Sequence, residues 1–281
     1  MNLRLAYLTL GLLMVTLLCG MDGGCGIGRL TSDYYYYPNW MPDGRIVCVK
    51  KRVITYSGSF VFPGKEEEHY YITTMSDEGT QEADIREISR LGQVVASPLG
   101  NYIAVTDWKN LRIFTSTGAD VKSIDCGEGI NSFDWSPDET RIAYSGDESK
   151  DLFVLRVSDE VKTKIASSAE GVAWRVGEVV IYGNLYCVNA DGSQNSYLAA
   201  GRYPQKISTL EVIYQGADFG VYKMSLYDRT SINKLFSDFS RASLKLSFGG
   251  TKIVGGDLDG YGNIKGVWVY TIDGKEKKQL R

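Results

Sequence analysis

This sequence predicts an all-β fold, and three observations lead to that prediction. The chain of 281 residues has 31 Gly, 19 Tyr and 5 Trp but only 6 Pro, a usage that favours strands joined by tight turns. Val, Ile and Thr are spread evenly between the turn signals. A unit of about forty residues also returns along the chain, and a period of this length is typical of repeat architectures.

The clearest copy of the repeat runs from Ile130 to Ser167 and contains four strand signals. We expect its strands at 133–136, 141–145, 152–157 and 162–166. Pro137 stands at the turn position whose φ angle it pre-sets, and Asp138 follows it as a turn residue. Four strands joined in this way form one antiparallel sheet.

Five further copies return with variations. They are PNWMPDGRIVCVK, VVASPLGNYIAVTD, VAWRVGEVVIYGNLYCVNADGS, LEVIYQG with VYKMSLYDRT, and LKLSFGGTKIVGG with GVWVYTIDGKEKKQL. A four-stranded sheet has two apolar faces, and radial packing of several sheets buries both of them. We therefore expect a six-bladed β-propeller of four-stranded antiparallel blades over residues 31–281, with Trp40, Trp135 and Trp174 buried between blades.

Two copies of the repeat carry a resemblance to a known family. FDWSPDETRIAYSG and PNWMPDGRIVCV resemble the W-S-P-D-G-x-x-I-A-F repeat of TolB-like propellers, which are built from WD-like repeats. The resemblance covers roughly residues 31–281 and implies the fold, but it implies no activity, because such folds host many functions. TolB itself carries an additional N-terminal α/β domain that this sequence does not show. The resemblance is therefore to the propeller family and not to TolB.

The N-terminus differs in kind from the rest of the chain. Arg4 precedes an apolar run from Leu5 to Leu18, which has the length of a signal-peptide core and is too short to span a bilayer. We expect residues 1–25 to be a signal peptide with a helical core. The mature protein is then exported, and it is either periplasmic or attached to the cell envelope by a lipid.

The cysteines leave the mode of attachment open. VTLLCGMDGGC resembles the end of a bacterial lipoprotein signal, and Cys19 is the better lipidation candidate because it directly follows the apolar core. Cleavage between Gly20 and Gly26 without a lipid is the alternative, and a disulfide in an oxidising compartment is another. Three later cysteines have no metal-ligand spacing and are expected to be small buried hydrophobes: Cys48, Cys126 and Cys187.

Charge and histidine content argue against several functions. The net charge of −3 gives no electrostatic reason to expect a surface that binds phosphates, so we expect no nucleic-acid partner. His69 is the only histidine, which leaves one way to build a Ser-His-Asp or Cys-His site and too few ligands for catalytic zinc, copper or iron. It falls in a charged insertion at 56–71 that we expect to be a solvated loop, with a recognition loop as the alternative.

One segment leaves a calcium site open. GGDLDGYGNIKG places Asp257, Asp259 and Asn263 at alternate positions around two glycines, as in loops that bind calcium through side-chain oxygens. Tyr261 takes one ligand position, however, and Trp268 stands where an EF-hand has its bidentate acid. A long hairpin in the last blade explains the same glycines. We therefore expect no cofactor and keep calcium as the alternative.

These observations predict a binding module and not an enzyme. We expect a monomeric envelope protein that captures a protein or polymer on the face where the loops between second and third strands meet the central channel. The candidate binding residues are Asp107, Lys109, Asp147, Lys150, Asn184, Asp218, Asp257, Asp259 and Asn263. One alternative is a propeller enzyme that acts on glycans through paired carboxylates and holds a structural calcium. Another is the accessory propeller of a peptidase.

Overall fold

The computed structural model describes residues 29–57, 64–174, 177–208, 211–227, 231–237, 239, 244–258, 261 and 264–281. Over these ranges the chain is all-β, with 24 strands and no helix, and its sheets are antiparallel. The expected fold class is confirmed to that extent. No helix in this part of the chain has the length and apolar character to cross a membrane. The predicted signal peptide, with Cys19, lies outside the described residues.

Four of the five sheets have four strands each, and in each sheet these strands follow one another in the sequence. They are β5 (Val94–Ala96), β6 (Tyr102–Asp107), β7 (Asn110–Thr115) and β8 (Asp120–Asp125); β9 (Ile130–Trp135), β10 (Arg141–Gly146), β11 (Leu152–Arg156) and β12 (Lys162–Ala166); β13 (Val172–Trp174), β14 (Val179–Tyr182), β15 (Tyr186–Asn189) and β16 (Ser196–Tyr197); β17 (Arg202–Lys206), β18 (Glu211–Gln215), β19 (Val221–Ser225) and β20 (Ile232–Phe236).

The fifth sheet has eight strands and unites the first copy of the repeat with the last. Its strands are β1 (Arg29–Trp40), β2 (Ile46–Tyr56), β3 (Lys65–Met75), β4 (Ala83–Ile88), β21 (Lys245–Leu246), β22 (Lys252–Leu258), β23 (Ile264–Thr271) and β24 (Lys277–Gln279). The two halves meet where β1 pairs with β23, through Tyr36 and Lys265. β24 pairs with the later part of β23.

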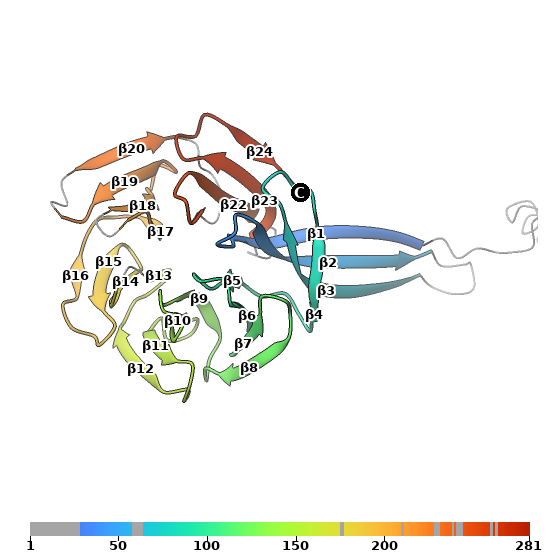
Figure 1. The fold of residues 1–281 in the computed structure, drawn as a ribbon, viewed down its shortest axis with the longest axis horizontal. Helices are drawn as coiled ribbons and strands as arrows, with labels where there is room; N and C mark the ends of the chain where they lie inside the picture. The colour runs from blue at the N-terminus through green and yellow to red at the C-terminus, as the bar shows by residue number, and fades with distance from the viewer. Residues whose placement is uncertain are drawn as a thin grey trace, which may run out of the picture. The chain divides into compact units, whose positions relative to one another are not determined.

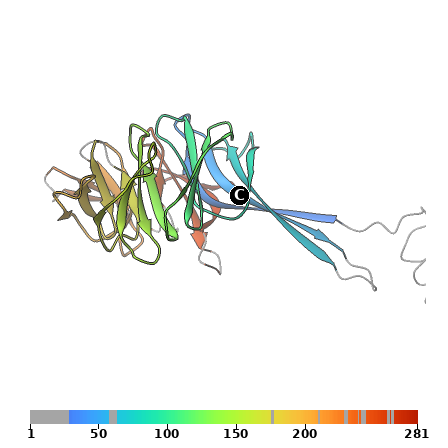
Figure 2. The ribbon, with the colours of Figure 1, turned by 90° about the horizontal axis from the view of Figure 1, so that it is seen from below.

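The chain divides into two compact units, one of residues 1–32 and 53–68 and one of residues 33–52 and 69–281. In the larger unit, first strands of successive sheets lie beside one another: β5 contacts β9, β9 contacts β13, β13 contacts β17, and β17 contacts β21. The ribbons from β5 to β20 follow one another in chain order, with first strands innermost and fourth strands outermost (Figure 1). Figure 2 shows the same ribbons turned by 90°. This arrangement is compatible with a β-propeller.

Strand residues occupy both ends of the charged insertion at 56–71, where the sequence predicts a loop. β2 continues to Tyr56 and β3 begins at Lys65, and residues 58–63 between them lie outside the described ranges. The Tyr56 hydroxyl donates to the Glu67 carboxylate at 3.2 Å, and the Lys65 ammonium lies 2.7 Å from the same carboxylate. The loop prediction is wrong here, because charged side chains occupy the exposed positions of a strand.

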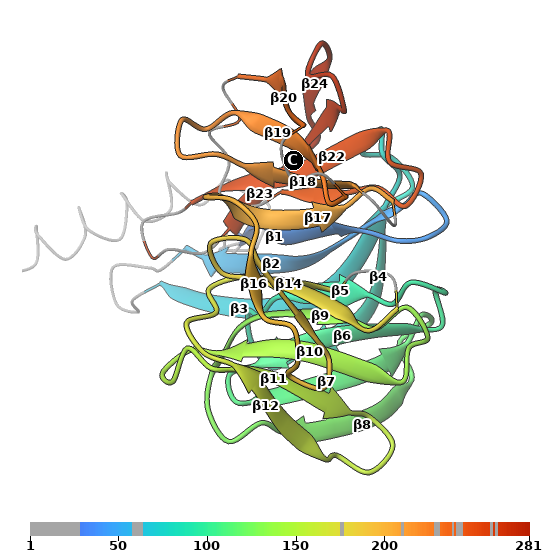
Figure 3. The ribbon, with the colours of Figure 1, turned by 90° about the vertical axis from the view of Figure 1, so that its left-hand side faces the viewer.

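The third copy of the repeat is folded as its sequence predicts. Each of its four strands lies within three residues of the expected bounds, and its sheet is drawn beside that of β5 to β8 in Figure 3. Asp138 accepts hydrogen bonds from the Ser136 hydroxyl at 2.6 Å and from the Thr140 amide at 3.2 Å. It therefore stabilises the turn between the first two strands, as expected of an Asx turn.

Two tryptophans tie neighbouring copies of the repeat together. Trp40 and Trp135 are each 2% exposed, so their expected burial is confirmed. The indole of Trp40 donates to the Lys245 carbonyl at 3.1 Å, and that of Trp135 donates to the Val95 carbonyl at 3.3 Å. Each indole thus anchors its own first strand on the first strand of a neighbouring copy. The buried Trp174 instead bonds within its own sheet.

Ion pairs also join the last copy of the repeat to the first. Three basic side chains of the last copy meet three acidic side chains between β3 and β4. The pairs are Lys252 with Asp77, Lys278 with Glu78 at 2.5 Å, and Arg281 with Glu82 at 3.3 Å. Because each side carries one sign of charge, the junction between the two copies is electrostatically matched.

This junction should weaken in acid. Burial alone would raise the pKa of Glu82, but hydrogen bonds from Lys50 and Tyr35 outweigh that effect and hold the pKa below its ordinary value of 4.5. A depressed folded-state pKa contributes stability that is present above the unfolded value and lost as the pH falls through the folded one.

We therefore expect the free energy of unfolding to fall below about pH 4.5 and to do so less steeply in Glu82→Gln. Urea titrations between about pH 7 and pH 3 measure this dependence. If the free energy of unfolding fell equally steeply with pH in both proteins, the assignment to Glu82 would be wrong.

Candidate functional site

A cavity of about 590 Å³ lies among the innermost strands of the larger unit. Every copy of the repeat contributes a segment at or just before its first strand. These segments are 37–39, 91–95, 129–132, 170–171, Tyr203 and Lys245. Connections between second and third strands add Trp108, Asp147 and Tyr261. The cavity therefore lies where sequence reasoning expects the central channel to meet the loops between second and third strands.

Side-chain amides around this cavity link one first strand to the next. Asn39 donates to the Val94 carbonyl at 3.5 Å, Gln93 donates to the Asn131 carbonyl at 2.5 Å, and Asn131 donates to the Glu170 carbonyl at 3.2 Å. These bonds fix the relative positions of β1, β5, β9 and the segment before β13. Sequence reasoning missed them, because an Asn or Gln in a strand gives no signal of its partner.

Of the predicted binding residues that the structure describes, Asp147 alone is among those that line the cavity. Several charged residues of the other predicted loops contact neighbouring side chains. Asp107 accepts from the Ser89 hydroxyl at 3.0 Å, Lys109 lies 3.3 Å from Asp125, and Lys150 lies 3.3 Å from Asp147. Asn184 is exposed on the turn after β14.

Asp218 is the most strongly held of these carboxylates. It accepts from the Lys234 ammonium and the Tyr222 hydroxyl, both at 2.7 Å, and from the Gly220 amide at 3.1 Å. The Lys234 hydrogen bond is the largest reason why the pKa of Asp218 lies well below its ordinary value. A carboxylate with this many donors organises its own loop.

Trp108 is the side chain that its loop presents at the cavity. It is 65% exposed, and with Lys109 it forms the whole connection between the paired residues Asp107 and Asn110. Its φ angle of 54° lies in the left-handed region, which a bulky residue occupies at a cost of about 1–3 kcal/mol. Glycine is the usual residue for such a φ in a two-residue hairpin. Backbone strain of this kind is concentrated at functional sites.

The neighbouring chain segment holds Trp108 in place. The Ile130 amide donates to the Trp108 carbonyl at 3.2 Å. A methyl group on Gly129 would meet indole atoms at 3.4 and 3.5 Å and the Asp147 Cβ at 3.3 Å, so the indole and Asp147 pack against the bare backbone of Gly129. Trp108 and Asp147, from adjacent sheets, thus form one continuous piece of the cavity wall.

Glu128 organises the loop that carries Asp147. Its carboxylate accepts from the amides of Glu148 and Ser149 at 3.1 and 2.9 Å and from the Ser149 hydroxyl at 2.7 Å. The Glu128 carboxylate packs directly against Gly146, so a methyl group there would have to displace it. Sequence reasoning missed Glu128, although an acidic residue just before a first strand was visible.

The charged side chains that line the cavity differ in their exposure to solvent. Asp147 and Glu170 are exposed carboxylates, whereas the ammonium of Lys245 is half-buried on β21. Desolvation lowers the pKa of Lys245, and the charge of Asp134 opposes that effect only in part. Both carboxylate oxygens of Asp134 accept backbone hydrogen bonds, from Trp135 at 3.0 Å and from Trp174 at 2.9 Å.

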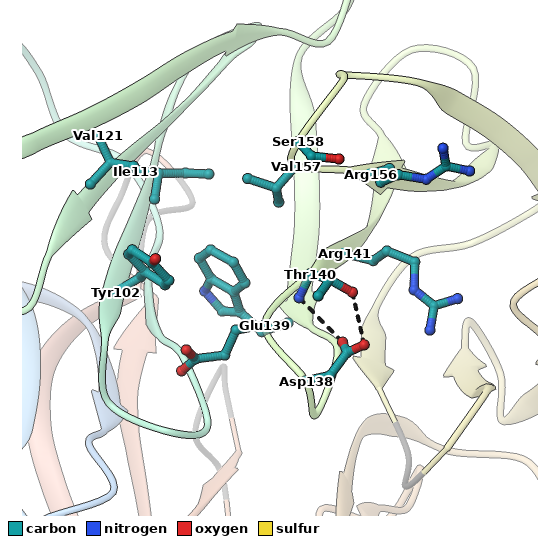
Figure 4. A pocket seen from close by; sticks show the side chains of 11 residues that line it. Tyr102, Ile113, Val121, Asp138, Glu139, Thr140, Arg141, Arg156, Val157 and Ser158 are labelled. Carbon is teal, nitrogen blue, oxygen red and sulfur yellow. Dashed lines mark hydrogen bonds between the residues drawn. The ribbon is translucent and has the colours of Figure 1, made fainter.

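A second groove, of about 560 Å³, lies between the sheets of β5–β8 and β9–β12 (Figure 4). Tyr102 and Trp135 stack in its wall with ring centroids 5.9 Å apart. Glu139 crosses between the sheets and accepts from the Leu99 amide and the Asn101 side chain, both at 2.8 Å. These groups serve the contact between the two sheets, so we assign this groove a structural role.

The residues considered for chemistry do not come together. His69 lies in β3, where its Nδ1 is 2.9 Å from the Glu87 carboxylate. Cys48, Cys126 and Cys187 are free, and burial raises the pKa of the Cys48 and Cys126 thiols. The indole of Trp268 donates to Asp257 at 3.2 Å, while Asp259 and Asn263 lie outside the described residues. Within the described ranges, no three His, Cys, Asp or Glu side chains form a group that could hold a metal.

The chain was compared by sequence with protein-family models and with curated proteins. No protein-family model matches it, and no curated protein matches it by sequence.

Proposed function

We propose that this chain is a six-bladed β-propeller of the TolB-like kind. Two features support the proposal. The 24 described strands fall into six consecutive groups of four, and the first strands of neighbouring groups contact one another. The indoles of Trp40 and Trp135 make the same kind of bond to a neighbouring first strand, about ninety-five residues apart in the chain. A ring of sheets with buried faces follows from these contacts.

We further propose that the propeller is a non-catalytic module that binds a protein or polymer of the cell envelope at its central cavity. The observation that carries this proposal is Trp108, a strained and exposed indole held against the cavity wall. Tryptophan is enriched among the residues that dominate binding energy, because it supplies a large rigid contact area. The fixed amides and the exposed carboxylates beside it offer polar partners for a ligand.

Export and attachment belong to the same proposal. The apolar run before Cys19 supports a signal peptide, and Cys19 is the proposed site of lipid attachment for a monomer on the envelope. Labelling with a fatty-acid probe, compared between the wild type and Cys19→Ala, tests the lipid. Label that persists in the variant would refute attachment at Cys19.

The substitution Trp108→Gly should weaken binding without destabilising the fold. Glycine accepts a φ of 54° without steric cost, so the free energy of unfolding should stay the same or rise by up to about 1 kcal/mol. Loss of the indole should weaken partner binding about thirtyfold, the effect of a residue worth about 2 kcal/mol. The partner is first captured by crosslinking in envelope fractions and purified, and its Kd is then measured against both proteins.

Leu99→Ala is the matched control. Leu99 is also 65% exposed, but it lies on the connection between β5 and β6 and does not line the cavity. Its substitution should leave the Kd unchanged. If Trp108→Gly binds the partner as tightly as the wild type does, the binding site is elsewhere.

A further inference from the structure

We infer that Lys245 is an anion-binding residue of the central cavity and that the ligand presents a carboxylate to it. The inference rests on the proposed function, since it names the chemistry of the ligand that the cavity would take. It begins from the position of Lys245 on β21. Its carbonyl accepts the indole of Trp40 at 3.1 Å, so the backbone that carries the ammonium is fixed.

Lys245 lines the cavity, and within the described residues its ammonium has no hydrogen-bond or ion-pair partner. A fully buried lysine elsewhere in the protein is treated differently. Lys50 is 2% exposed, and its ammonium contacts the carboxylates of Glu82 at 3.0 Å and Asp84 at 2.5 Å. The charge of Lys50 is therefore neutralised inside the protein, whereas Lys245 is available to pair with a ligand in the cavity.

Asp134, whose charge acts on Lys245, already accepts hydrogen bonds from other groups. Asp134 accepts from the amides of Trp135 and Trp174, so its two oxygens fix the backbones of two neighbouring sheets. The charge of Asp134 raises the pKa of Lys245, which only partly offsets the effect of burial. A charge that is partly removed from water and has no partner is unfavourable, and an entering anion relieves that cost. Burial lowers the pKa of Lys245 for the same reason.

The chemistry of the cavity favours a carboxylate over a bare inorganic anion. Glu170 lines the same cavity and repels free anions, while Asp147 beside it is paired with Lys150 at 3.3 Å. A ligand therefore gains most when its carboxylate is joined to donors whose hydrogen bonds these two carboxylates can accept. The side chain of an acidic amino acid and a uronic acid sugar both have this combination. The shared group is a carboxylate beside amide or hydroxyl donors.

The test uses two carboxylate probes with neutral counterparts. N-acetylglutamate amide is compared with N-acetylglutamine amide, and glucuronate with glucose, each titrated into the full-length protein and followed by NMR. We expect one acid to bind and its neutral counterpart not to bind, and the acid that binds identifies the source of the carboxylate. Lys245→Met should weaken that binding about tenfold or more, and Lys245→Arg should retain most of it. Lys277→Met, at an exposed position of β24, should leave it unchanged.

The melting temperature of each variant shows whether a loss of binding is caused by misfolding. Removal of an unpaired, half-buried charge should leave the melting temperature of Lys245→Met unchanged or raise it, which is opposite to the effect expected for a structural lysine. A variant that loses acid binding and melts at a lower temperature is replaced in the comparison by Lys245→Gln, which keeps a polar end.

The outcomes distinguish this inference from the proposed function. If neither acid binds, or if the acid binds Lys245→Met as tightly as the wild type, the carboxylate site is refuted even where Trp108→Gly abolishes partner capture. If Lys245→Met loses acid binding while Trp108→Gly still captures the partner, the carboxylate site stands and the proposed binding face is wrong.

Discussion

Lys50→Met is expected to lower the free energy of unfolding by about 3 kcal/mol. Lys50 is 2% exposed, and it bridges Glu82 and Asp84 at 3.0 and 2.5 Å. Methionine keeps most of the volume of the side chain but removes its charge, which leaves two partly buried carboxylates facing each other without their shared cation. Breaking a buried ion pair by removing one partner costs about 3–5 kcal/mol, and the partial exposure of the two acids places this case at the lower end.

The effect should spread beyond the first copy of the repeat. Glu82 also accepts from the Tyr35 hydroxyl at 2.8 Å and pairs with Arg281 at 3.3 Å, so it links Lys50 to the last residue of the chain. Urea unfolding measures the change. Lys275→Met is the matched control, because Lys275 pairs with Asp273 at 2.9 Å but its side chain is 82% exposed, and such surface pairs contribute about 0–1 kcal/mol.

A double-mutant cycle tests the assigned cause. In a background of Glu82→Gln with Asp84→Asn, the cost of Lys50→Met should fall substantially, because no unpaired carboxylates remain. An equal cost in both backgrounds would mean that packing of the lysine stem, and not its charge, is what the substitution removes.

Gly92→Ala is expected to cost about 3 kcal/mol of stability and to weaken partner binding as well. Gly92 lines the cavity, and a methyl group there would overlap the carbonyl oxygen of Thr106 on the adjacent strand. The backbone would have to separate at this point. Two hydrogen bonds would be lost with it, from the Thr106 amide to the Gln93 carbonyl at 2.9 Å and from the Gln93 amide to the Thr106 hydroxyl at 2.8 Å.

The loss of binding has a geometric cause. Trp108 follows Thr106 by two residues, so a displacement of Thr106 moves the indole away from the cavity wall. Gly171→Ala is the matched control. Gly171 also lines the cavity and precedes a first strand, but a methyl group there has nothing within 4 Å. Denaturation and Kd measurements on both variants check the contrast, and a Gly92→Ala protein as stable as Gly171→Ala would show that the backbone relaxes freely.

The parts of the fold that sequence predicts best are those in which local signals agree. In the third copy, Pro137 and Asp138 define a turn and apolar residues alternate on both sides of it, so the strand bounds agree closely with the structure. The insertion at 56–71 fails for the opposite reason. The acidic run beside Lys65 has poor strand propensity, but pairing between strands overrides that preference in β3.

The loops of the predicted binding face could be located from the sequence, but the contacts of their side chains could not. The loops between second and third strands were correctly placed, since the repeat fixes their position in every sheet. The residues chosen in them were charged, and the structure shows that Asp107, Lys109 and Asp218 are held by neighbours that a sequence cannot pair with them. Trp108 carried a usable signal, because a bulky residue in a two-residue hairpin turn is unusual. The sequence around Lys245 carried no such signal.

The eight-stranded sheet has a consequence for how the protein folds. Trp40 and the Lys245 carbonyl that it contacts are 205 positions apart in the chain. Contacts of such long range form late, because the entropy of closing a large loop must be overcome before they can stabilise anything. Until then β1 and the early part of β23, which pair in the finished sheet, each present an unpaired flank that invites pairing with another molecule. Assembly of this protein should therefore be slow and concentration-sensitive, with aggregation competing against the last step.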